Sequence, residues 1–433
     1  MECYSMSAPS LMEQDHACIW HPFTQMHTTA FSIPIVRAKG LYLYDENGMR
    51  YADGISSWWV NLHGHAHPYI AEKIAAQAEI LEHVLFAGFT HPPAVHLASR
   101  LLQLLPGQMS KIFYSDNGST AVECAIKMAL QYWYNQDCET KKLQLICFRN
   151  SYHGDTFGAM SASGKNAFNK PFWKHLFEVK TIDLPQKGGD SSAYLQLQAI
   201  LSEEKAACFI FEPLVLGTGG MLTYPPDALN ALIRLCKEHR VLTIADEVMT
   251  GFGRTGTLFA CAQLSESPDL ICLSKGLTGG FLPLGVTACT ESIFNAFLGS
   301  SLSQAFLHGH SYTANPLACT SALASLDLLL EHSCLKQREM ITTSHAAFCL
   351  KWKKHPRLRR CEHIGTLLIV EYHSGRPSSY FEPIGKHLYQ FFLTRGILLR
   401  PLGNVLYLMP PYCIQLDELE WIQDQIILSL EEK

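Results

Sequence analysis

The sequence has few charged residues and no paired-cysteine spacing, and each absence excludes a class of protein. Asp, Glu, Lys and Arg make up 17% of the 433 residues, and 34 basic against 39 acidic side chains leave a net charge of −5. The chain therefore lacks the basic excess of nucleic-acid-binding or polybasic membrane proteins. None of its 15 cysteines has the C-x-x-C spacing of zinc or redox sites. We interpret them as apolar core residues in a reducing compartment.

Two further segments bear on where the protein resides. Residues 1–20 contain three acidic side chains and no apolar run, which is not typical of a secretory signal, so we predict a cytoplasmic protein. Residues 292–326 contain no Asp, Glu, Lys or Arg, but glycines, a proline, histidines and many serines interrupt them. Such a segment cannot span a bilayer, and we expect it to be buried against protein or a cofactor.

The apolar residues are arranged as in an α/β protein. Hydrophobic residues make up 48% of the chain and aromatic residues 11%, which excludes intrinsic disorder. Short apolar runs alternate with helical patterns from about residue 108 onward, which indicates a mostly parallel sheet covered on both faces. The expected strands are residues 111–114, 143–148, 207–211, 241–245 and 270–273, and the expected helices are residues 121–133, 192–203 and 228–239.

The end of the chain follows another pattern. A helix expected at residues 321–330 is followed by alternating segments at 366–372 and 405–409, and then by a helix from about Leu416. We predict three units: an N-terminal segment (1–60) that packs with the small domain, a large domain (61–330), and a C-terminal α+β domain (331–433).

Unusual residues follow the expected strands, where ligands of open α/β sheets bind. A Gly/Ser turn at residues 115–120 opens a helix and offers free N–H groups to a phosphate, although most such turns are plain caps. Thr120 and Glu123 have the spacing of a capping box. Tyr152 follows the next strand and is either a stacking residue for a planar ligand or a packed loop aromatic.

Two charged residues end later strands. Asp246 follows an apolar run, so its carboxylate needs a partner, either a cationic ring nitrogen or a structural salt bridge such as one to Arg254. Lys275 is the only charged residue between Asp269 and Glu291, and such apolar surroundings lower the pKa of an amine, as a Schiff-base lysine requires. A snorkelling lysine is the alternative. Jointly, the strand ends predict a pyridoxal phosphate site.

The glycine-rich run at residues 217–220 superficially resembles a dinucleotide-binding loop. We discount that interpretation because the G-x-G-x-x-G spacing is absent and no helix opens at the glycines. Histidines at positions 63, 65 and 67 have no carboxylate or cysteine clustered with them in the sequence, so we predict no metal site.

Three segments carry a family resemblance. They are Glu212-Pro213 with Gly219-Gly220, the run DEVMTGFGRTG at residues 246–256, and Ser274-Lys275-Gly276. In this order they resemble the central signature of the class III (subgroup II) aminotransferases of fold type I, and the resemblance covers nearly the whole chain. It implies pyridoxal 5′-phosphate as cofactor, a large domain with a mostly parallel seven-stranded sheet, and a smaller α+β domain.

The resemblance implies which residues bind the cofactor. Lys275 forms the Schiff base and moves the proton, Asp246 binds the pyridinium nitrogen, and Tyr152 stacks on the ring, with Val248 on the other face. Lys275, Asp246 and Tyr152 are thus the predicted catalytic residues. The predicted phosphate-binding residues are Asn117, Gly118 and Ser119.

It also implies a substrate cleft and a partner subunit. Phe23 and Trp58 line the cleft together with Tyr152, and Arg400 pairs with the carboxylate of the keto acid, a bidentate role suited to arginine. A homodimer with shared active sites is implied, because three residues reach the phosphate and substrate of the neighbouring subunit: Gly309, His310 and Ser311.

Within the family, six segments are most similar to those of biotin-pathway members that transfer an amino group from S-adenosylmethionine to 8-amino-7-oxononanoate. These segments are residues 20–24, 54–59, 63–65, 152–156, 308–311 and 400–411. The resemblance implies this reaction by a ping-pong mechanism. Such members usually have tyrosine where this chain has Phe23, whereas a lysine-using branch has phenylalanine there but tends to lack the first tryptophan of Trp58-Trp59.

Other functions remain as alternatives. The same reaction with lysine as donor is the nearest, followed by an ω-aminotransferase for another diamine or amino acid, which the Trp58-Trp59 and Arg400 segments disfavour. A dinucleotide-binding oxidoreductase and a non-catalytic scaffold belong to other classes. Colour separates them, because a lysine Schiff base with pyridoxal phosphate makes a pure protein yellow.

Overall fold

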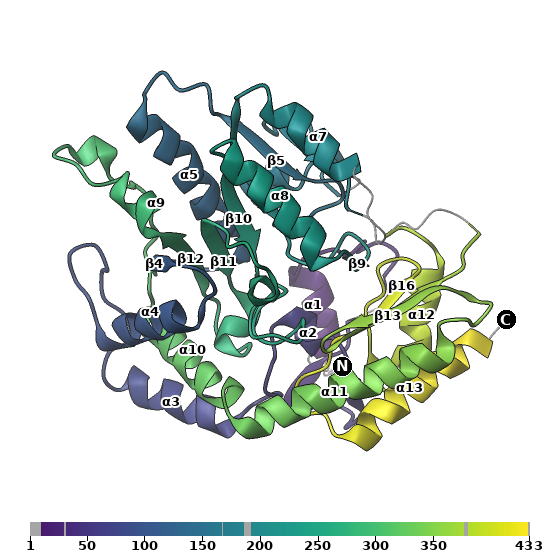
Figure 1. Ribbon diagram of the computed structural model, residues 1–433. Coiled ribbons are helices and arrows are strands. Elements are labelled where there is room, and N and C mark those ends of the chain that lie inside the picture. The colour runs from purple at the N-terminus through teal and green to yellow at the C-terminus, as the bar shows by residue number, and fades with distance from the viewer. Residues whose placement is uncertain (1–9, 30–31, 167, 186–191, 376–379, 432–433) are drawn as a thin grey trace, which may run out of the picture.

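The computed structural model describes residues 10–29, 32–166, 168–185, 192–375 and 380–431, and its centre is a seven-stranded sheet (Figure 1). The strand order is β4-β12-β11-β10-β7-β5-β6. β12 is antiparallel to both of its neighbours, and the other pairs are parallel, which confirms the predicted α/β class with a mostly parallel sheet. The strands are β4 (Met109–Ser115), β5 (Gln144–Phe148), β6 (Val179–Ile182), β7 (Ala206–Phe211), β10 (Leu242–Asp246), β11 (Leu270–Leu273) and β12 (Gly285–Thr290).

Helices cover both faces of this sheet because its central strands are apolar on both sides. Cys208 and Ile210 of β7 share one apolar cluster with α5 (Gly118–Gln136). The intervening Phe209 and Phe211 belong to the cluster that contains α8 (Pro226–Glu238). All residues of β7, β10 and β11 are buried, which explains why these strands are continuous apolar runs without alternation.

Two smaller sheets lie beside the large one. β13 (Leu358–Ile364), β14 (Leu367–Tyr372) and β16 (Val405–Leu408) form an antiparallel sheet that packs with α11 (His332–Trp352). α12 (Ile384–Leu393) and α13 (Leu416–Glu431) complete this part (Figure 1). The other sheet joins β1 (Ile35–Lys39), β2 (Tyr42–Asp45) and β3 (Arg50–Asp53) to β15 (Ile397–Leu398). The division into three units stays a prediction, which the pairing of β3 with β15 supports.

The remaining elements connect these sheets. They are α1 (Leu11–Cys18), α2 (Ser56–Trp59), α3 (Pro68–Ala78), α4 (Pro92–Leu104), α6 (Phe157–Ala162), α7 (Ser192–Leu201), α9 (Glu291–Asn295), α10 (Pro316–Leu329) and the short pair β8 (Val215–Leu216) with β9 (Leu222–Thr223). Residues 1–9 of the N-terminal segment lie outside the described residues.

Helix starts differ from their predicted positions for local reasons. The Asn117 side chain caps α5 by accepting the Thr120 N–H, and the Thr120 hydroxyl accepts the Asn117 N–H. The capping box predicted for Thr120 with Glu123 is therefore wrong, and Glu123 instead accepts the Ala159 N–H. α8 and α10 begin earlier than expected, at Pro226 and Pro316, because proline is well suited to the first turn of a helix.

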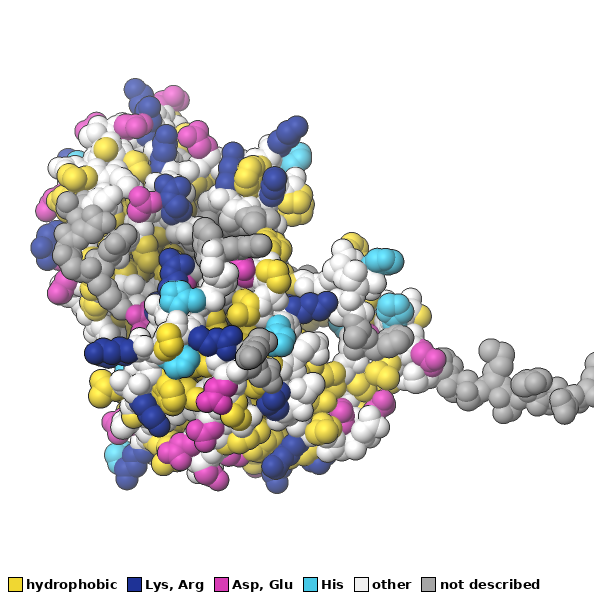
Figure 2. Space-filling view, turned by 90° about the vertical axis from the view of Figure 1, so that its right-hand side faces the viewer, with side chains coloured by type: hydrophobic (Ala, Val, Ile, Leu, Met, Phe, Trp, Pro, Cys, Tyr) yellow, Lys and Arg dark blue, Asp and Glu magenta, His cyan; other side chains and the backbone are white. Residues whose placement is uncertain are grey.

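The uncharged segment 292–326 is buried along part of its length. α10 packs against α3 and α4, as expected for burial against protein. Leu302, Leu307 and Tyr312 are instead 76%, 67% and 65% exposed in the single chain, so burial of this stretch stays a prediction. None of the helices in the described ranges is long and apolar enough to cross a membrane. Figure 2 shows basic and acidic side chains interspersed over one face of the molecule.

Candidate active site

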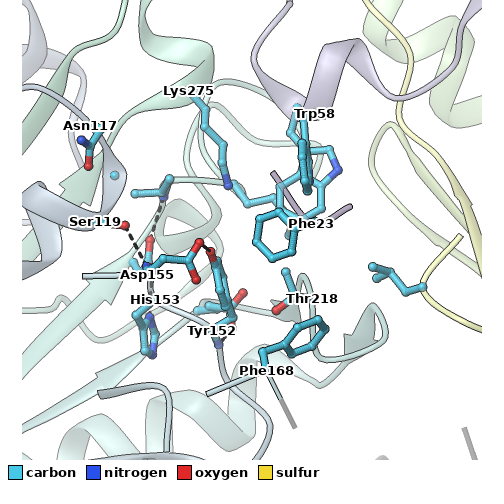
Figure 3. A pocket seen from close by; sticks show the side chains of 18 of the residues that line it. Phe23, Trp58, Asn117, Ser119, Tyr152, His153, Asp155, Phe168, Thr218 and Lys275 are labelled. Carbon is cyan, nitrogen blue, oxygen red and sulfur yellow. Dashed lines mark hydrogen bonds and ion pairs between the residues drawn. The ribbon is translucent and has the colours of Figure 1, made fainter. Parts of the chain in front are cut away.

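One cavity of about 510 Å³ lies at the carboxyl ends of the central strands, and Figure 3 shows its lining. It brings together ten of the predicted site residues: Phe23, Trp58, Asn117, Gly118, Ser119, Tyr152, Asp246, Val248, Lys275 and Arg400. The structure does not bring Gly309, His310 and Ser311 to this cavity. These three residues lie between α9 and α10, and their expected contribution to a neighbouring subunit stays a prediction.

Lys275 lies two residues after the end of β11, next to Ser274, and its backbone has a left-handed φ of 47°. Its side chain points into the cavity, and the Nζ lies 4.3 Å from the centre of the Trp59 ring (Figure 3). Burial lowers the pKa of Lys275 to about 8, against the opposing influence of the Asp246 and Glu212 carboxylates. About a tenth of the amine is therefore neutral at about pH 7, and this neutral form is able to act as a nucleophile.

Asp246 is the last residue of β10 and is only 4% exposed. Its Oδ2 lies 2.7 Å from Nδ1 of the buried His153, and its Oδ1 accepts the Val248 N–H at 3.1 Å. The alternative partner Arg254 is wrong, because that guanidinium donates to the Pro410 and Asn61 carbonyl oxygens instead. The Asp246 carboxylate is thus held in place by a histidine that the sequence analysis did not select.

Glu212 joins two loops beneath the cavity. One carboxylate oxygen accepts the Tyr152 N–H at 2.9 Å and the other accepts the Gly217 N–H at 2.8 Å. Burial raises the pKa of Glu212 to about 7, with the nearby Asp246 carboxylate acting in the same direction. The Tyr152 hydroxyl donates to Asp155 Oδ2 at 2.8 Å, which fixes the ring at the cavity wall. Within the run at 217–220, Thr218 lines the cavity.

The helix start at α5 forms a close-fitting turn in the cavity wall. A Cβ on Gly118 would lie 2.7 Å from Val248 Cγ1, so glycine is required for the turn to approach that side chain. The first N–H groups of a helix have no partner within the helix and carry its positive dipole end. Ser119 Oγ accepts the Asp155 N–H at 3.2 Å, which links the turn to the loop after β5. This geometry suits a phosphate group.

A left-handed turn presents two tryptophans to the cavity. Ser56, Ser57, Trp58 and Trp59 have φ values of 50°, 45°, 70° and 76°, although none is glycine. The Ser56 hydroxyl donates to the Met409 carbonyl at 2.8 Å, and Trp59 Nε1 donates to the Tyr407 hydroxyl at 3.1 Å. Backbone strain of this kind is held only where surrounding contacts determine it, and it is common at functional sites.

The aromatic residues at the mouth of the cavity contact one another. The rings of Phe23 and Trp58 meet edge to face with centres 5.4 Å apart, and the Arg400 guanidinium lies 4.7 Å from the Trp58 ring centre. Phe23 is 50% exposed and Trp58 36%, so both rings retain free surface for a ligand. A cation–π contact thus positions Arg400, which also lines the cavity.

Comparison with known proteins identifies the family. The model of the family described as aminotransferase class-III matches residues 23–430. The chain belongs to the class III aminotransferases. The Synechococcus elongatus protein named adenosylmethionine-8-amino-7-oxononanoate aminotransferase is 46% identical over 96% of this chain and 99% of its own. Its namesake from Staphylococcus aureus is 37% identical over 92% of both chains.

Solved structures of class III aminotransferases have the same fold. The adenosylmethionine-8-amino-7-oxononanoate aminotransferase of Methanocaldococcus jannaschii superposes with a TM-score of 0.92 at 34% identity, over 97% of this chain and 98% of its own. An omega transaminase of Pseudomonas jessenii in complex with PMP gives a TM-score of 0.90 at 25% identity, over 98% of each chain.

Membership of the class III aminotransferases makes the chain a pyridoxal phosphate-dependent transaminase. The cavity fits this cofactor on the chemistry of its donor set. It offers an amine of lowered pKa at Lys275, a buried carboxylate at Asp246, and a helix start whose Gly118 leaves no room for a side chain. These groups correspond to the aldehyde, the ring nitrogen and the phosphate of pyridoxal phosphate.

Sequence reasoning assigned no site role to several residues of the aminotransferase cavity. They are His153, Asp155, Phe168, Glu212, Thr218, Tyr380 and Tyr407, of which Glu212 was noted only as part of the family signature. His153 and Asp155 belong to the segment 150–155, in which only Tyr152 was predicted to be a site residue.

The histidines at positions 63 and 65 form hydrogen bonds with other side chains. His63 bonds to Ser325 Oγ at 3.0 Å, and His65 bonds to Asp53 Oδ2 at 2.8 Å.

Proposed function

We propose that this class III aminotransferase transfers an amino group from S-adenosylmethionine to 8-amino-7-oxononanoate, giving 7,8-diaminononanoate for biotin synthesis. Relatives named for this activity reach 46% identity over nearly the whole chain. The observation that carries the proposal is the single cavity in which Lys275 and Asp246 lie inside while Trp58 and Arg400 lie at the mouth. The similarity does not favour lysine as the donor.

The roles of the inner residues follow from their chemistry. Bound pyridoxal phosphate supplies an electron sink for breaking the bond between hydrogen and the amino-bearing carbon. Lys275 holds the cofactor and moves the proton at its Nζ, for which a lowered pKa is suited. Asp246 keeps the ring nitrogen protonated, and His153 orients that carboxylate. Tyr152 and Val248 line the same cavity and would flank the ring, and residues 117–119 at the start of α5 would hold the phosphate.

The outer residues select the substrates. Arg400 binds the carboxylate of 8-amino-7-oxononanoate through two parallel N–H bonds. Phe23 and Trp58 cover the cleft, and the missing hydroxyl of Phe23 leaves their ring contact intact. The donor is therefore recognised by aromatic surface at this position, without a hydrogen bond from residue 23.

A donor half-reaction tests the proposed function. The pure protein is expected to be yellow, and S-adenosylmethionine, but not lysine, is expected to bleach its visible band. The Lys275→Ala variant is expected to lack the covalent absorption and serves as the control. Bleaching by lysine alone would move the chain to the lysine-using branch, and a colourless wild type that gains no band with pyridoxal phosphate would overturn the assignment.

We also propose a cytoplasmic homodimer with shared active sites. Gly309, His310 and Ser311 are absent from their own chain's cavity, and the neighbouring Leu307 and Tyr312 expose large apolar surfaces of the kind that subunit interfaces cover. In this arrangement the three residues complete the cavity of the second copy. The interface would be isologous, with each subunit giving one loop and receiving one.

Mixed dimers test the sharing. Lys275→Ala and His310→Glu are each expected to be inactive as homodimers, the second because a carboxylate would face the partner's phosphate site. Random mixing leaves one intact site in each mixed dimer, so about one quarter of wild-type activity is expected to return. Mixed dimers that form and stay inactive would contradict the proposal.

A further inference from the structure

Two aromatic side chains outside the family signature form an outer wall of the cavity. Phe168 follows α6, and Tyr380 precedes α12, so they come from distant parts of the chain. Their ring centres are 4.6 Å apart, with the ring planes inclined at 65°. Both residues line the same cavity as Lys275. Figure 3 shows Phe168 across the open part of the cavity from Phe23.

The wall is chemically unlike the inner end of the cavity. The inner end contains Lys275, Asp246 and Glu212, whereas Arg400 is the charged side chain that borders the aromatic end within the described residues. Tyr380 and the buried Tyr407 line the same cavity. Both wall residues are half-buried and keep ring surface open to a ligand.

The donor has a part that matches this surface. Its amino-acid end must reach Lys275, so its purine extends away from the reacting carbon toward the mouth. A purine is planar with apolar faces, and such rings stack on aromatic side chains. The acceptor is an unbranched aliphatic chain with a carboxylate and has no planar ring to stack.

We infer that Phe168 and Tyr380 form the binding wall for the purine of S-adenosylmethionine and so set the specificity for the donor. The inference rests on the proposed function and adds a subsite to it. The two residues do not contact the reacting atoms. They act on the affinity for the donor and leave the acceptor half-reaction unaffected.

Substitutions that keep apolar volume but remove the ring test the wall. Phe168→Leu and Tyr380→Leu are each expected to raise the donor concentration needed for half-maximal bleaching by about tenfold. The concentration dependence for 8-amino-7-oxononanoate is expected to stay unchanged. Tyr380→Phe keeps the ring and is the matched control, in which the donor dependence of the bleaching is expected to be retained. An unchanged visible band and unchanged thermal unfolding of each holoenzyme exclude a folding defect.

A binding measurement separates stacking from catalysis. 5′-Methylthioadenosine carries the purine but lacks the amino-acid end of the donor, and calorimetry with the holoenzyme is expected to show the same loss of affinity in both leucine variants. Equal donor dependence in wild type and leucine variants would overturn this inference alone, as would an equal loss for the acceptor. A wild type that S-adenosylmethionine does not bleach would instead overturn the proposed function.

Discussion

The lowered pKa of Lys275 leads to a prediction for the rate at which the apoprotein captures its cofactor. Burial shifts this pKa from an ordinary 10.5 to about 8. At about pH 8, roughly half of such amines are neutral, compared with about 0.3% of amines that have an ordinary lysine pKa. Only a neutral amine attacks an aldehyde carbon. Capture near pH 8 is therefore expected to be on the order of 100-fold faster than with an unperturbed lysine.

The assay is the appearance of the visible band after pyridoxal phosphate is added to stripped apoprotein. The second-order rate constant is measured from about pH 6 to about pH 10, the range in which the amine titrates. The rate is expected to rise about tenfold per pH unit up to about pH 7 and to level off above pH 8. Lys275→Ala is the control, because any band that it forms does not come from this amine.

The direction of the profile decides the outcome. The pKa of a buried amine falls because burial disfavours the charged form, so the plateau must begin below the ordinary pKa. A rate that still climbs steeply at about pH 9.5 would show an ordinary amine and refute the reasoning. A plateau shared by a small-molecule amine under the same conditions would assign the profile to the cofactor instead.

Three further predictions concern residues around the cofactor. His153→Ala removes a hydrogen bond to a buried carboxylate, worth about 1.5–3 kcal/mol, so cofactor affinity is expected to fall about tenfold or more and the visible band to move, as read by absorbance titration. The pKa of Glu212 is raised on folding from 4.5 to about 7, so the folded state binds the proton more tightly and stability from this group decreases as pH rises through that range. Urea unfolding of the apoprotein measures this effect. Between about pH 5 and pH 8, the free energy of unfolding of the wild type is expected to fall relative to that of Glu212→Gln by on the order of 1–3 kcal/mol. Arg400→Lys keeps the charge but not the fork, so the KM for 8-amino-7-oxononanoate is expected to rise about tenfold while bleaching by S-adenosylmethionine is unchanged; equal damage to both half-reactions would contradict the role of Arg400.

The sequence predicted elements whose apolar residues follow a regular period, and it missed elements in which polar residues occupy buried positions. β7, β10 and β11 are wholly buried and were predicted within one or two residues. α11 has 21 residues and was not predicted, because its buried positions include Arg338 and His345 among cysteines, Ile341 and Phe348. β12 was missed because its small residues resemble a loop.

The candidate site shows the same limit for a different reason. Lys275 and Asp246 could be selected because each is a charged residue at the end of its own apolar run. Their partners could not, because the contact between His153 and Asp246 joins positions 93 residues apart and depends on the order of strands in the sheet. Phe168 and Tyr380 meet across two separate parts of the chain, and no local pattern marks either.

The left-handed turn at residues 56–59 is the feature that local reasoning describes least well. Each non-glycine residue in that conformation costs about 1–2 kcal/mol, so an isolated chain would avoid it. Contacts with Met409 and Tyr407 hold the turn, and Trp59 is 4% exposed beneath them. Because those anchors lie near the C-terminus, the orientation of Trp58 in the cavity depends on docking of the C-terminal segment. The position of Trp58 and the docking of that segment are thus linked through one strained turn.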